Sequence, residues 1–200
     1  MPVLYHFSEE PGIAVFEPRI MPSRPEITVP LVWAIDEPHQ FMYLFPRDCP
    51  RILLWPLPTT SDEERDRWFG RTEARALAHI EYGWLERLRS TRLVRYEMPP
   101  AVEPGSRGAA GFVSLDDAGM WVSRETVVPS RVDVVDDLIE ALREQGVELR
   151  ILDRLTPMRG LWETTTLHWS SIRMRNARDW DAPLGGTVPP QIRSMMGDRG

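Results

Sequence analysis

Short apolar runs, each bounded by a turn or a proline, most constrain what this chain can fold into. Val3–Ser8 alternates apolar and polar residues before a Glu-Glu-Pro-Gly turn, which predicts a half-buried strand. Leu31–Ile35 is continuously apolar, as expected of a strand buried on both faces. Further strands are predicted over residues 52–57, 76–81, 93–98, 132–135 and 147–152, and a hairpin over 111–128.

Helices are predicted between these strands, where capping residues precede a helical pattern. Asp36 can cap a helix that contains Tyr43 and ends near Pro46. Asp136 is expected to cap a helix that runs to Gln145. The other helices are predicted over residues 61–70, 82–89 and 156–177. Together, these strands and helices predict an α+β fold.

The length of 200 residues predicts one hydrophobic core. We expect a single α+β domain over residues 1–178 and a flexible tail over 179–200, where glycines and prolines occur without periodicity. No apolar run approaches the roughly 20 residues that span a bilayer. The lone Cys49 cannot form an internal disulfide, which suits a reducing compartment. A soluble, cytoplasmic protein is therefore expected, without a membrane partner.

All 24 basic residues are arginines, so every cation is a planar fork suited to carboxylates or phosphates, and lysine Schiff-base chemistry is excluded. The net charge of −6 argues against binding to duplex DNA, which requires a broad basic surface. The four histidines have no metal-ligand spacing, so no metal site is expected.

Two groups of polar residues are candidates for a binding site. His6 and Ser8 share one face of the first strand and can present a ring nitrogen and a hydroxyl to a ligand; the alternative is a buried histidine bonded to the backbone. Arg47 and Arg51 lie in a proline-bracketed loop with Asp48, which would hold two guanidinium forks for an anion. The alternative there is pairing with neighbours that only fixes the loop.

A third and a fourth candidate group come later in the chain. Glu125 ends a predicted strand that begins at Trp121, where it could act as an acid or a base, or instead be a solvent-facing charge. Arg124 lies on the opposite face of that strand. Arg173, near the end of the predicted helix, can bind phosphate or simply complement the helix dipole.

Five sequence blocks, distributed up to about Ala177, resemble a family of uncharacterised bacterial proteins. The resemblance covers almost the whole chain, and it implies no activity. The blocks are LYHFSEEPGIAVFEPR, VWAIDEPHQFMYLFPRDCPR, TRLVRYEMP, WVSRE and IRMRNA.

Shorter motifs resemble the ADP-ribosyltransferase superfold and its RNA 2′-phosphotransferases. Leu4-Tyr5-His6 is similar to the opening strand of that fold, in which the histidine contacts the ribose of NAD, and Tyr43 matches an aromatic residue that stacks on nicotinamide. The family's glutamate position falls at Gly119 or Met120, with Glu125 downstream.

The second resemblance implies a split β-sheet core with flanking helices that binds NAD or a related nucleotide. ADP-ribose transfer is the activity it implies, with His6 and Glu125 as catalytic residues; the alternative is a non-catalytic module that binds a nucleotide or a protein. The implied ligand-binding residues are Ser8, Tyr43, Arg47, Arg51, Arg124 and Arg173.

Overall fold

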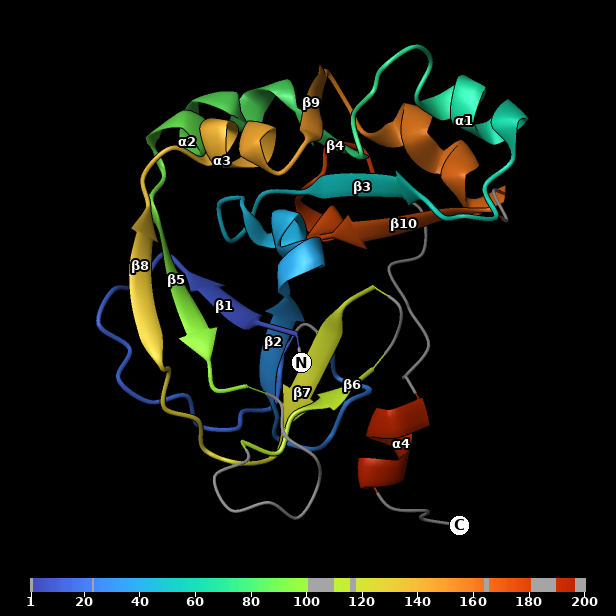
Figure 1. The fold of residues 1–200 in the computed structure, drawn as a ribbon. Coiled ribbons are helices and arrows are strands. Elements are labelled where there is room, and N and C mark those ends of the chain that lie inside the picture. Colours follow the sequence, from blue (N-terminus) through green and yellow to red (C-terminus); the bar gives the residue numbers. More distant parts are fainter. Residues whose placement is uncertain are drawn as a thin grey trace. The chain divides into compact units, whose positions relative to one another are not determined.

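The structure, a computed structural model, describes residues 2–22, 24–100, 110–115, 118–163, 166–180 and 190–196. Two β-sheets and a few short helices confirm the predicted α+β class (Figure 1). The chain divides into two compact units, which we describe separately. The first unit comprises Met1–Gln40, Leu93–Val134 and Gly186–Gly200, and the second comprises Phe41–Arg92 and Val135–Gly185.

The first unit is built on a six-stranded sheet in the order β6-β7-β2-β1-β5-β8. The opening strand β1 lies inside this sheet, antiparallel to both β2 and β5. The elements of this unit are β1 (Leu4–Ser8), β2 (Val32–Asp36), β5 (Leu93–Met98), β6 (Val113–Ser114), β7 (Met120–Ser123), β8 (Arg131–Val135) and α4 (Pro190–Met196), and η1 (Glu37–Tyr43) is shared with the second unit.

Two apolar clusters hold the first unit together. One contains the fully buried Leu4 and Tyr96 and the ring of Phe16. The other contains Ile27 and the fully buried Ile192, which belongs to α4. Residues 190–196, which belong to the expected tail, form the helix α4 that contributes this buried side chain.

The second unit is built on a four-stranded sheet in the order β10-β3-β4-β9, in which only β4 and β9 are parallel. Its core contains Ile52, Leu77 and Leu155, all fully buried. Its elements are β3 (Arg51–Pro56), α1 (Asp62–Trp68), β4 (Ala76–Glu81), η2 (Tyr82–Trp84), α2 (Leu85–Ser90), α3 (Leu138–Glu144), β9 (Val147–Leu152), η3 (Thr156–Glu163), β10 (Leu167–Ile172) and η4 (Met174–Asn176).

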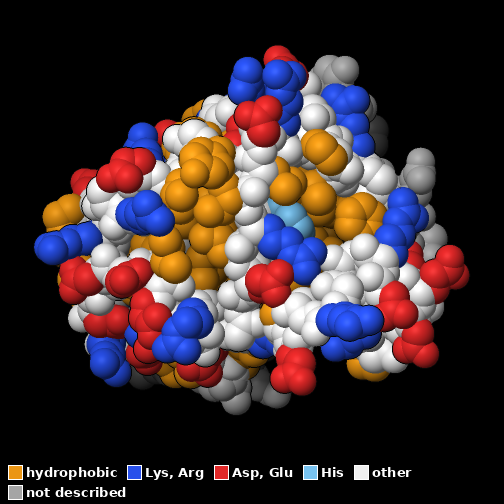
Figure 2. All heavy atoms as spheres, turned by 90° about the horizontal axis from the view of Figure 1, so that it is seen from above, with side chains coloured by type: hydrophobic (Ala, Val, Ile, Leu, Met, Phe, Trp, Pro, Cys, Tyr) orange, Lys and Arg blue, Asp and Glu red, His pale blue; other side chains and the backbone are white. Residues whose placement is uncertain are grey.

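The face of the molecule that carries α1, α2 and α3 has a mixed surface. Figure 2 shows hydrophobic side chains gathered in groups on this face, with arginine and acidic side chains interspersed around them. Charges of both signs therefore alternate here, and this face is not a uniformly basic surface. A site for an anion on this face must consequently be local.

The predicted helix over 156–177 is wrong. The structure has the 3₁₀ helix η3 followed by the strand β10, which pairs antiparallel with β3. Leu167 and Trp169 alternate with polar residues and pack in the core of the second unit, so a period of two, not 3.6, describes this segment. Pairing with a distant strand overrides the local pattern.

Candidate functional site

The loop before β3 is held together by the side chain of Arg51, the first residue of that strand. Arg51, which is 3% exposed, donates from Nε to the carbonyl of Met42 at 2.7 Å and from Nη1 to the carbonyl of Cys49 at 3.0 Å. Its guanidinium also lies over the rings of Tyr43 and Phe45, at 5.7 and 5.1 Å from the centroids. The Arg51 side chain is therefore held rigidly inside this loop.

Arg51 keeps its charge in this buried position. Burial lowers the pKa of its guanidinium to about 10, so the group is still protonated at neutral pH. Among the residues that the structure describes, no carboxylate forms an ion pair with it. A buried charge is unfavourable unless it is compensated. Backbone carbonyls and aromatic faces compensate Arg51 only in part, so the region keeps an excess of positive charge.

A second segment brings further cations to the same loop. Arg173 joins β10 to η4 with a left-handed φ of 58°, and its Nε donates to the carbonyl of Arg47 at 3.1 Å. Asn176 donates from Nδ2 to the carbonyl of Asp48 at 2.7 Å. The turn after β10 therefore binds two carbonyls of the loop before β3, and the buried side chain of Arg51 binds the same loop from inside.

The terminal nitrogens of Arg173 form no hydrogen bond to any described residue. Burial lowers the pKa of Arg173, the positive charges of Arg175 and Arg47 lower it further, and Asp48 acts in the opposite direction. Nε thus holds this guanidinium in place, while its terminal nitrogens have no hydrogen-bond partner in the described part of the chain. We call Arg47, Arg51 and Arg173, together with Tyr43, the arginine cluster.

The cluster joins four of the residues that the sequence proposes as ligand-binding. Tyr43 is half-buried at the end of η1, beside Arg51, and its hydroxyl contributes to the electrostatics of both Arg51 and Arg173. All four residues belong to the second unit. The predicted phosphate-binding role of Arg173 rested on a helix that is not there, so its place in the cluster has a different structural basis.

His6 and Ser8, in the first unit, have local partners. The Nδ1 of His6 lies 2.9 Å from the carbonyl of Trp33, and because a carbonyl only accepts, this nitrogen must carry the proton. The His6 ring lies 4.7 Å from that of Phe16. The Oγ of Ser8 accepts the backbone N–H of Glu10 at 3.0 Å. Their role toward a ligand stays a prediction.

Glu125 and Arg124 also belong to the first unit, but the predicted strand over 121–125 is too long. β7 ends at Ser123, whose Oγ donates to the carbonyl of Ala110 and accepts the backbone N–H of Glu125 at 3.0 Å. This side chain competes with sheet pairing and turns the backbone. Glu125 and Arg124 are therefore exposed residues of a turn, and the prediction that they alternate across a strand is wrong.

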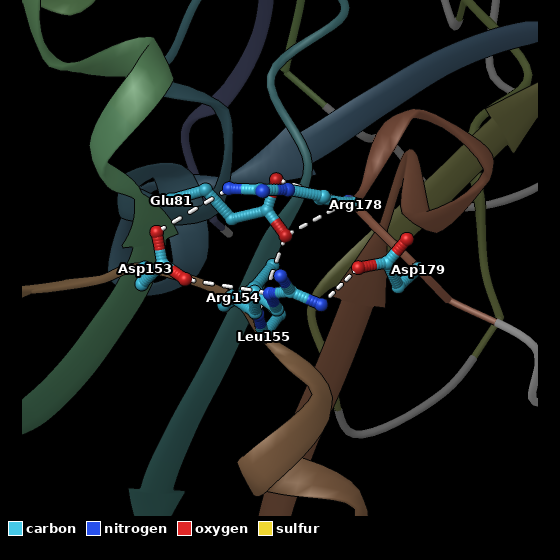
Figure 3. A network of polar contacts seen from close by, with 6 residues as sticks. All are labelled: Glu81, Asp153, Arg154, Leu155, Arg178 and Asp179. Atoms are coloured by element: carbon cyan, nitrogen blue, oxygen red, sulfur yellow. Dashed lines mark hydrogen bonds and ion pairs between the residues drawn. The ribbon is translucent and has the colours of Figure 1, made fainter.

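Sequence reasoning missed Glu81, which ends β4 and is 5% exposed. Its carboxylate accepts the backbone N–H of Arg178 at 2.9 and 3.1 Å and that of Leu155 at 3.3 Å (Figure 3). The only signal in the sequence is an acidic residue at the end of an apolar run. Around it, ion pairs form among the side chains of Asp153, Arg154, Arg178 and Asp179.

Two other buried groups of the second unit are uncharged at neutral pH. Burial raises the pKa of the Cys49 thiol to about 12, so this side chain is not a thiolate nucleophile there. Burial likewise lowers the pKa of His79 to about 4. Within the described ranges, no three or more His, Cys, Asp or Glu side chains are grouped to hold a metal ion, and no helix could cross a membrane.

Comparison with known families identifies the chain as a member of DUF6886, a family of unknown function, over residues 5–177. This match confirms the predicted membership of an uncharacterised family. Neither the curated proteins nor the solved structures contain a match to the chain, so the resemblance to the ADP-ribosyltransferase superfold is not supported.

Proposed function

For this member of a family without an assigned activity, we propose that it binds a phosphate-bearing ligand of the nucleotide class at the arginine cluster. One observation carries the proposal: Arg51 is buried and charged, and no described carboxylate pairs with it. A bound anion would compensate that charge. The terminal nitrogens of Arg173, which bond to none of the described residues, would contact the anion directly.

The chemistry of the cluster favours a phosphate over a simple halide. A guanidinium presents its donors as a planar fork, which matches two oxygens of one phosphate group. The half-buried ring of Tyr43 adds an aromatic surface beside the cations, on which a planar base can stack. NAD and ADP-ribose combine both features and are the ligands that we expect.

We propose binding rather than group transfer as the activity of the cluster. Transfer of ADP-ribose from NAD would need a group that activates the acceptor, and the Cys49 thiol is protonated at neutral pH. The arginine cluster as defined contains neither His6 nor Glu125, the residues to which the resemblance assigns catalysis. NAD is therefore expected to bind without release of nicotinamide, which an assay of free nicotinamide checks.

Calorimetric titration with ADP-ribose tests the proposal on three proteins. Arg173→Gln is expected to weaken binding by about tenfold or more, because it removes a charge-assisted bidentate contact. Arg89→Gln is the matched control, since Arg89 is an exposed cation on α2 in the same unit. The proposal fails if the wild type shows no binding at millimolar ADP-ribose, or if both variants weaken it equally.

A further inference from the structure

We infer that Glu81 is a positioning residue of the arginine cluster, acting through the backbone of the segment that carries Arg173. The inference rests on the proposed function. Glu81 does not pair with a side-chain cation in the described part of the chain; all its described hydrogen bonds come from backbone N–H groups. It thus fixes the path of the chain, as Figure 3 shows for Leu155 and Arg178.

The turn that carries Arg173 is anchored at both ends. On one side, Ile172 is paired in the sheet with Arg51. On the other side, the N–H of Arg178 is held by both carboxylate oxygens of Glu81. Arg173 lies between these anchors, so its direction depends on both.

The backbone of Arg173 needs such an anchor. A φ of 58° is a left-handed conformation that non-glycine residues rarely adopt, and it persists only where surrounding contacts impose it. The Glu81 contact is one of these, beside the hydrogen bond from Asn176 Nδ2 to the Asp48 carbonyl, so its loss should weaken the hold on the left-handed turn. The guanidinium of Arg173 would then move away from the carbonyl of Arg47, to which its Nε now donates.

Positioning and electrostatics predict opposite effects for this residue. A carboxylate repels an anionic ligand, so by its charge alone Glu81 weakens binding, and Glu81→Gln would tighten it. As a positioning residue, Glu81 strengthens binding, and Glu81→Gln weakens it. The sign of the change therefore separates the two explanations.

A pair of substitutions at Arg178 isolates the backbone contact. Arg178→Ala removes the side chain and keeps the N–H that Glu81 accepts, whereas Arg178→Pro removes that N–H. The preceding Ala177 has φ −76° and ψ 143°, the extended conformation that a following proline favours. Both variants lack the Arg178 side chain, so the difference between them reports the change at the backbone of residue 178, and it does not depend on how well Glu81→Gln folds.

The test is an ADP-ribose titration of the wild type, Glu81→Gln, Arg178→Ala and Arg178→Pro. We expect Glu81→Gln and Arg178→Pro to bind about tenfold more weakly, because a displaced guanidinium loses its alignment, and Arg178→Ala to bind almost as the wild type does. In an Arg173→Gln background, Glu81→Gln should have little further effect. Tighter binding by Glu81→Gln, or equal affinities of the two Arg178 variants, would overturn the inference.

A ligand-free measurement separates failure of this inference from failure of the proposed function. In ¹⁵N-labelled protein, the Nε–H resonance of Arg173 should shift in Glu81→Gln and Arg178→Pro and stay in place in Arg178→Ala. If the resonance shifts but the wild type binds no ADP-ribose, the anchor stands and the proposed function fails. If it does not move in any variant, the anchor fails whatever the protein binds.

Discussion

Burial acts differently on three ionisable side chains of the second unit. It leaves His79 and Cys49 uncharged at neutral pH, because burial disfavours the charged form of each group: it lowers the pKa of His79 and raises that of Cys49. Arg51 starts from so high a pKa that a value of about 10 still leaves it charged. Of these three buried groups, only the arginine offers a charge to a ligand.

His79 makes stability depend on pH. Burial lowers its pKa from an ordinary 6.5 to about 4, and its Nδ1 lies 3.3 Å from the carbonyl of Ile52. Between these values the unfolded chain binds a proton that the folded chain does not, so stability is lost as the pH falls below about 6.5. At about pH 5 the loss from this residue should approach 2 kcal/mol.

Denaturant unfolding of the wild type and His79→Gln between about pH 7.5 and pH 5 checks this value. Glutamine can still donate to the Ile52 carbonyl but does not titrate. The variant should therefore lose distinctly less free energy of unfolding over that range. Parallel pH profiles for the two proteins would show that His79 does not carry the effect.

Single residues of the site could be predicted only in part. Arg47 and Arg51 were predicted together because they lie close in the sequence and share a proline-bracketed loop. The contact of Arg173 with that loop depends on the pairing of β10 with β3, and the role of Glu81 depends on backbone groups at residues 155 and 178. No local pattern reports such distant contacts.

At the scale of elements, the boundaries of several strands follow directly from composition. β4, β5 and β9 occupy the predicted ranges 76–81, 93–98 and 147–152, because each is a short segment rich in apolar residues between clear turn signals. The helix after Asp36 forms in its predicted place but as the 3₁₀ helix η1. β10 was missed because a run with aromatic and serine residues fits either period until its partner strand is known.

The start of α3 shows how a helix cap is misassigned by one residue. The structure has Asp137 as the cap, with Oδ1 accepting the N–H groups of Ile139 at 3.0 Å and Glu140 at 2.9 Å. The predicted cap, Asp136, instead forms an exposed ion pair with Arg92 at 3.2 Å. Two adjacent aspartates satisfy the sequence pattern equally well.

These adjacent aspartates make a matched pair for a stability test. Asp137→Ala should lower the free energy of unfolding by about 1 kcal/mol, because two backbone donors lose their acceptor. Asp136→Ala should cost no more than about 0.5 kcal/mol, since exposed ion pairs contribute little. Chemical denaturation of both variants decides which residue is the cap, and an inverted order would contradict the assignment.

At the scale of the whole molecule, the α+β class could be predicted, but which strands pair within each of the two sheets could not. In the first sheet, β1 pairs with β5, whose residues lie far along the chain. The chain also passes from one unit to the other several times. Amphipathic patterns say which face of a strand is buried and not which strand it pairs with. The ADP-ribosyltransferase-like arrangement stays a hypothesis.

The composition of the whole chain makes its cationic side chains easy to observe by NMR. Because all 24 basic residues are arginines, one isotope label reports on every basic side chain. The chain is acidic as a whole, so non-specific attraction of an anion to its surface should be weak. A response confined to a few arginines would therefore identify a site.

The most direct test is a titration of ¹⁵N-arginine-labelled protein with ADP-ribose, followed through the arginine Nε–H resonances. The account predicts saturable shifts for Arg51 and Arg173, the latter assigned by the loss of its signal in Arg173→Gln, and unchanged signals for the exposed Arg89 and Arg143. Shifts spread evenly over exposed arginines, or none at millimolar ADP-ribose, would contradict the claim that the arginine cluster binds a phosphate-bearing ligand.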